Sequence, residues 1–181
     1  MVNLSKVTRE ELVQHLTPPP GITIPPYPAK RDKIYRLSLV LVGLGLAAEG
    51  ISGILGMTQA QFWIQGAISL IFIISGWTFL VWLKQWRWIV RAMVVLGLIV
   101  WPFGSLEAWA LSLVAGAIMA AKETHCFHFW AGRVIPWYTL VLGVLLVAGL
   151  PQPYMGVGWL GLAVLWMSLA MGRSKLPLFE V

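Results

Sequence analysis

Charged residues are scarce in this chain of 181 residues: they make up 11% of the sequence, whereas hydrophobic residues make up 59%. A soluble globular domain needs more charged side chains than this to cover its surface. The mean hydropathy of +0.79 is typical of a chain whose helices face lipid. The composition therefore excludes a soluble globular domain and predicts an integral membrane protein.

Sequence signatures of catalysis are also missing. The chain has no Gly-rich phosphate loop, no nucleophile elbow, no His-Glu-x-x-His zinc motif and no repeated acid-rich helices of the di-iron kind. A transporter would show polar residues on several spans, but the apolar blocks offer Glu49, Gln65 and a few serines. The single cysteine, Cys126, excludes an internal disulfide. We therefore do not expect an enzyme, and the sequence names no reaction.

The 13 Lys and Arg residues gather in four places along the chain. These are the N-terminal tail through Arg36 and the stretches 84–91, 122–133 and 173–175. The three apolar blocks between them hold no basic residue, and each has a Gly, Pro or polar break near its middle, at 56–61, 102–106 and 151–153. Because positive residues stay in the cytoplasm during insertion, this pattern predicts three helical hairpins with both termini cytoplasmic or stromal.

The expected fold is an all-α integral membrane protein with six short transmembrane helices. We place the spans at about 35–55, 62–83, 89–103, 106–121, 134–150 and 156–171, with an error of a few residues at each end. Several are shorter than the roughly 20 residues that cross a bilayer without tilt. Fusing the third and fourth spans would give a rod longer than a bilayer and would put Lys122 and Arg133 on the opposite side, so six spans are preferred.

The chain divides into three parts. Residues 1–33 form a cytoplasmic arm, which we expect to hold a short amphipathic helix opened by a capping box at Thr8–Glu11 and then a Pro-rich extended linker. Residues 34–172 form the transmembrane domain, and residues 173–181 form a cytoplasmic tail. Two roles stay open for the arm: a leader without function, or an arm that docks on a partner. The polar, Pro-rich arm does not match a cleavable signal peptide.

Small residues predict where helices approach closely. The first span carries Gly43, Ala47 and Gly50 on one face, and the fourth carries the pair Gly116 and Ala120. Such spacings allow close backbone contact between helices in lipid, so these two spans are expected to be central. The sixth span has a similar face of small residues, which packs either within the bundle or on a partner protein.

Glu49 is the one ionisable residue placed well inside a predicted span. A carboxyl group within a membrane is costly, so it deserves a functional hypothesis. Three roles stay open: a neutral group hydrogen-bonded to a neighbouring helix, a proton relay, or a ligand for a pigment magnesium. We favour the first role, with Gln61, Gln65 and Glu107 as possible partners.

The segment 122–128 gathers two histidines, the cysteine and an acid, as a metal or haem site would need. A closed zinc site needs four ligands, and His15 is the one histidine elsewhere. We therefore expect an interfacial loop in which Lys122 and Glu123 pair locally, and we predict no metal site. Together with Glu49, His125 and His128 are the candidate cofactor ligands, for chlorophyll or haem.

The run Lys122-Glu123-Thr124-His125-Cys126-Phe127, followed by an apolar helix, resembles the Lys-Glu-x-x-Cys-Phe signature of a family of uncharacterised integral membrane proteins from cyanobacteria and plastids. The Lys33–Arg36 segment before the first span is similar in placement to the entry of that family. The family has no assigned activity, so the resemblance implies a compartment rather than a reaction. That compartment is the thylakoid or plasma membrane of a phototroph.

The function expected from the sequence is that of a non-catalytic auxiliary or assembly subunit of a photosynthetic membrane complex. Its partners would be membrane lipids and other integral membrane proteins, with a photosystem-type complex as one candidate. Nucleic acid is not expected, because the basic residues lie at the edges of apolar spans and fit topology signals and lipid headgroups better. The alternative is a pigment- or haem-binding membrane protein, and a small transporter is the third option.

Overall fold

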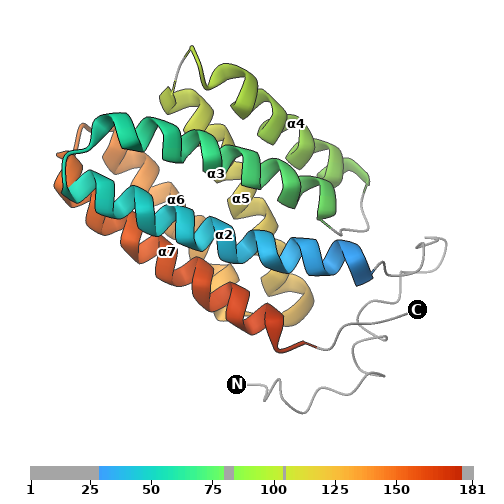
Figure 1. Ribbon diagram of the computed structural model, residues 1–181. Coiled ribbons are helices and arrows are strands. Elements are labelled where there is room, and N and C mark those ends of the chain that lie inside the picture. Colours follow the sequence, from blue (N-terminus) through green and yellow to red (C-terminus); the bar gives the residue numbers. More distant parts are fainter. Residues whose placement is uncertain (1–28, 80–83, 104, 177–181) are drawn as a thin grey trace.

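The computed structural model describes residues 29–79, 84–103 and 105–176, without the side chains of residues 105–107. The regular structure within these ranges is all helical (Figure 1). The helices are α2 (Ala29–Ile54), α3 (Thr58–Thr78), α4 (Lys84–Val100), α5 (Ser105–Phe127), α6 (Trp130–Val147) and α7 (Gln152–Ser174). The predicted all-α class is confirmed for these residues. The helix and the Pro-rich linker expected in the arm lie almost wholly outside them.

Four of the described helices, α2, α3, α6 and α7, are long and apolar enough to cross a membrane. The chain is therefore a helical membrane protein by length and composition. At 17 residues α4 is the shortest helix of the six, and it falls below the roughly 20 residues of a straight span. Membrane crossing by α4 and α5 stays a prediction.

Two helix ends differ from the sequence-based expectation. Helix α2 begins at Ala29 rather than near residue 35, and α5 continues to Phe127 through residues 122–127, for which the sequence predicts a loop. The reason is the same at both places: a charged residue, Asp32 or Glu123, turns into the bundle and is fully buried there. The helices therefore continue through these charged residues and do not end at them. The predicted domain borders after residues 33 and 172 fall inside α2 and α7.

Glycines end two helices where the sequence predicted breaks. Gly56 and Gly149 have φ angles of +67° and +77°, a left-handed conformation that glycine adopts without a Cβ penalty. After α6, the Leu150 amide donates to the Leu145 carbonyl at 3.1 Å. This bond across six residues is the usual glycine stop of a helix. The α2–α3 and α6–α7 connections are consequently tight turns.

The helices form a closed ring in which each packs against the next along the chain and α7 packs against α2 (Figure 1). The α2–α7 contact is the most extensive. Close to the end of α2 and the start of α7, a Cβ on Gly156 would lie 2.6 Å from the Gly50 carbonyl oxygen, so the two backbones nearly touch. Close approach of this kind is what small residues allow in lipid. The small face of the sixth predicted span therefore packs within this chain.

The four basic stretches meet at one end of the bundle, which we call the basic end. Arg31 at the start of α2 donates to the Trp77 carbonyl near the end of α3, at 2.7 Å. Arg91 of α4 contacts the same carbonyl at 3.4 Å, and Arg36 reaches the Leu176 carbonyl after α7 at 2.7 Å. The turns at 55–57 and 148–151 lie at the other end, the far end. The arrangement of the helices as three membrane hairpins stays a prediction.

Candidate functional sites

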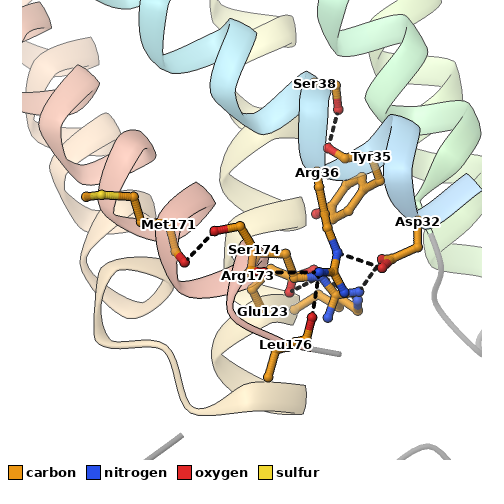
Figure 2. Close-up of polar contacts among 10 residues, drawn as sticks. Asp32, Tyr35, Arg36, Ser38, Glu123, Met171, Arg173, Ser174 and Leu176 are labelled. Carbon is orange, nitrogen blue, oxygen red and sulfur yellow. Dashed lines mark hydrogen bonds and ion pairs between the residues drawn. The ribbon is translucent and has the colours of Figure 1, made fainter. Parts of the chain in front are cut away.

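A buried ionic cluster joins three helices at the basic end (Figure 2). It consists of Asp32 and Arg36 from α2, Lys122 and Glu123 from α5, and Arg173 from α7. Asp32 and Glu123 are fully buried, and Arg173 is 2% exposed. Charges this far from water must be compensated by close partners.

Arg173 is the centre of the cluster. Its Nη2 atom lies 2.7 Å from Oδ1 of Asp32, and its Nε atom lies 3.6 Å from Oε2 of Glu123. The guanidinium also covers the Phe127 ring, with Cζ 4.2 Å from the ring centroid, a favourable cation–π geometry. One side chain of α7 thus contacts carboxylates of both α2 and α5.

Each of the two carboxylates in the cluster, Asp32 and Glu123, also pairs with a second cation. Arg36 donates from Nε to Oδ2 of Asp32 at 2.7 Å, and Lys122 donates from Nζ to Oε1 of Glu123 at 2.9 Å. The predicted Lys122–Glu123 pair is therefore confirmed, although it lies in a helix and faces the bundle interior. The cluster as a whole holds the ends of α2, α5 and α7 in register.

Local sequence patterns do not predict this cluster, because its two halves are far apart in the chain. Asp32 and Arg173 are separated by 141 residues, and Arg173 was assigned to a cytoplasmic tail. One local signal was present: Asp32 and Arg36 stand four residues apart, the spacing of an ion pair on a helix. That signal identifies the pair but says nothing of the third helix.

A second polar site surrounds Glu49 near the far end. Gln65 and Gln61 of α3 donate from their Nε2 atoms to Oε1 of Glu49, at 2.7 Å and 3.2 Å. These are two of the three partners that the sequence predicted; the side chain of the third, Glu107, lies outside the described residues. Glu49 is fully buried, and its other oxygen, Oε2, has no hydrogen-bond partner among the described residues.

Buried serines continue along the same face of α3 toward the basic end. Ser69 and Ser112 of α5 lie 3.1 Å apart, and Ser75 donates to Ser38 of α2 at 2.8 Å. Between these two pairs stands Phe72, whose ring meets the Trp166 ring edge to face at 5.8 Å. The polar groups thus form separate pairs, divided by aromatic packing.

His125 and His128 lie at the basic end, far from Glu49 along α2 and α5. Both side chains are exposed, one in the last turn of α5 and the other in the turn that follows. His128 has a φ of +56°, a conformation in which histidine is enriched, so it helps to end α5. Within the described part of the chain, no three His, Cys, Asp or Glu side chains gather into a group able to hold a metal. The three candidate cofactor ligands therefore do not form one site.

Neither the protein-family models, nor the curated proteins, nor the solved structures match this chain. The resemblance to the Lys-Glu-x-x-Cys-Phe family therefore stays a prediction, carried by that short motif.

Proposed function

We propose that this protein is a non-catalytic membrane subunit that acts by binding other integral membrane proteins. The observation that carries this proposal is that the buried polar side chains described below bond one helix of the bundle to another. Asp32, Glu123 and Arg173 join helices to one another, as do the amides around Glu49. These side chains stabilise a rigid bundle. Other molecules would therefore bind to its surface and not to its interior.

The surface suits a membrane partner. Large apolar side chains are exposed on every helix, and they include aromatic residues such as Trp63, Trp88 and Trp137, each more than half exposed. Aromatic residues are enriched in the cores of protein interfaces and in the headgroup zone of membranes. The resemblance to the cyanobacterial and plastid family supports a photosynthetic complex in the thylakoid as the proposed partner, with the chain as its auxiliary or assembly subunit.

Native gel migration and an absorption spectrum together test this function. We expect the protein to comigrate with a larger membrane complex when membranes are solubilised gently, and the purified chain to be colourless. A haem or chlorophyll band in the isolated chain would instead favour the pigment-binding alternative, for which Oε2 of Glu49, a buried oxygen without a hydrogen-bond partner among the described residues, is a candidate ligand atom. Migration as a free monomer under all mild conditions would contradict the proposal.

The proposed topology places the basic end in the cytoplasm or stroma, in agreement with the positive-inside rule. We expect an impermeant thiol reagent to label Ser174→Cys from the cytoplasmic side and Gln152→Cys from the opposite side, each in a Cys126→Ala background. Both positions are exposed and lie at opposite ends of α7. Labelling of both from one side would overturn the proposed insertion of α7.

A further inference from the structure

We propose that Glu49 is a proton-binding site that gives its proton to, and takes it from, water that reaches the carboxyl from the far end of the bundle, past Gln61 and Gln152. The proton is carried on Oε2. The proposal does not rest on the partner-binding function, because it concerns the interior of the bundle rather than its surface.

The hydrogen bonds distinguish the two oxygens of Glu49. Both amide donors, from Gln61 and Gln65, meet Oε1, and none of the described residues meets Oε2. A protonated carboxyl has one carbonyl oxygen that accepts and one hydroxyl oxygen that carries the proton. An ionised carboxyl would instead leave half of its charge uncompensated inside a span, which is costly. The observed pattern fits the protonated form.

Among the described residues, no basic side chain lies where it could neutralise a negative charge on Glu49. Every Lys, Arg and His within the described residues lies at the basic end. Among the helices packed on α2, α3 brings no titratable side chain to the far end, and α7 brings Tyr154, which is 67% exposed. Tyr138 of α6 donates to the Gly158 carbonyl, and Glu107 of α5 has no described side chain. A proton is therefore the chemically simplest counter-charge for Glu49.

A metal cation fits the site less well. Cations such as Na⁺ are held by several oxygen atoms turned to a common point. Here the groups that face Glu49 are amide N–H donors. Gln61 Nε2 lies 3.2 Å from Oε1 of Glu49 and 3.3 Å from Oε1 of Gln152, so two acceptors identify this atom as the nitrogen. These donors would repel a cation.

The path to water runs through a graded set of side chains. Gln152, the first residue of α7, is exposed; Gln61 is 6% exposed; Glu49 is fully buried. Toward the basic end the way is filled by Phe72 and Trp166, both fully buried, and a Cβ on Gly116 would already lie 2.7 Å from the Phe72 ring. Access from the basic end is therefore closed.

Carbodiimide labelling tests the proposal directly. Dicyclohexylcarbodiimide adds to a protonated carboxyl in an apolar site and yields a stable N-acylurea, which mass spectrometry locates. With the full-length protein in liposomes, we expect the initial rate of labelling at Glu49 to fall as the pH rises, to recover when the pH is lowered again before the reagent is added, and not to change with sodium concentration. Glu49→Gln, which keeps the acceptor oxygen, should remove the labelled peptide.

Two glutamine variants form a matched pair for the path. Gln61→Leu and Gln65→Leu each remove one amide donor from the same oxygen, but Gln61 alone also contacts Gln152. After a jump in external pH we expect Gln61→Leu to slow the change in labelling severalfold, and Gln65→Leu to leave its rate near that of the wild type. Gln152→Leu, at an exposed position that leaves the α2–α3 bonds intact, should slow the change as well.

Three results would overturn the proposal. Labelling that is constant across the pH range would make Glu49 a permanently neutral structural group. Protection by sodium would make the site a cation site. Equal rates in the wild type, Gln61→Leu and Gln152→Leu would exclude the path. None of these outcomes depends on whether the protein binds a membrane complex.

Discussion

Replacing Arg173 by methionine should lower the free energy of unfolding by about 3 kcal/mol, the lower end of what breaking a buried ion pair costs. The change removes a cation that contacts both Asp32 and Glu123. Each carboxylate keeps its second cation, Arg36 or Lys122, so the upper end of the range is not expected. The measurement is unfolding by a denaturing detergent, followed by tryptophan fluorescence.

Arg133→Met is the matched control for this change. Arg133 lies at the same basic end but is exposed, and an exposed arginine contributes little to stability, within about 0.5 kcal/mol. Equal stability of the Arg173 and Arg133 variants would show that the cluster does not hold the helices together.

Gly156→Ala should lower the free energy of unfolding by about 1–3 kcal/mol, the usual cost of overpacking. The new methyl group would lie 2.6 Å from the Gly50 carbonyl oxygen and 2.8 Å from the Ile54 amide nitrogen. Both atoms belong to the backbone of α2, so no rotamer change relieves the clash, and α2 and α7 must move apart. The same detergent unfolding measures the effect.

The control is Gly143→Ala in α6. A Cβ at this position meets no atom within 4 Å, and alanine favours a helix over glycine by up to about 1 kcal/mol. We therefore expect the variant to be as stable as the wild type or slightly more so. If Gly156→Ala were equally harmless, the close α2–α7 crossing would not be a source of stability.

Local sequence patterns predicted the elements well. The predicted break at 56–61 contains the turn at Gly56, and the predicted break at 151–153 begins two residues after the turn glycine Gly149, because a left-handed residue favours glycine wherever it occurs. The partners of Glu49 were also foreseen, since Gln61 and Gln65 stand on the next helix, joined to α2 by a tight turn. Because Gln61 and Gln65 are only 12 and 16 residues from Glu49 in the chain, few other polar side chains could reach it.

The ionic cluster was not foreseen, and the reason is physical. A charged residue next to an apolar span has two stable placements: in water, or inside the bundle beside an opposite charge. The first needs no partner, so the sequence favours it for Arg173 and Glu123. The second depends on which helices become neighbours, and the pairing of α2 with α7 joins the two ends of the described chain.

The sequence by itself therefore determined the helical class, the order and approximate length of the apolar helices, and the four basic stretches that separate the apolar blocks. These features follow from hydropathy and from backbone preferences within a few residues. Only the tertiary structure decided which helices touch, which charges are buried and which oxygen of Glu49 lacks a partner. Those outcomes depend on contacts between residues distant in the chain, such as Asp32 with Arg173 and Gly50 with Gly156, and no local pattern specifies such pairs.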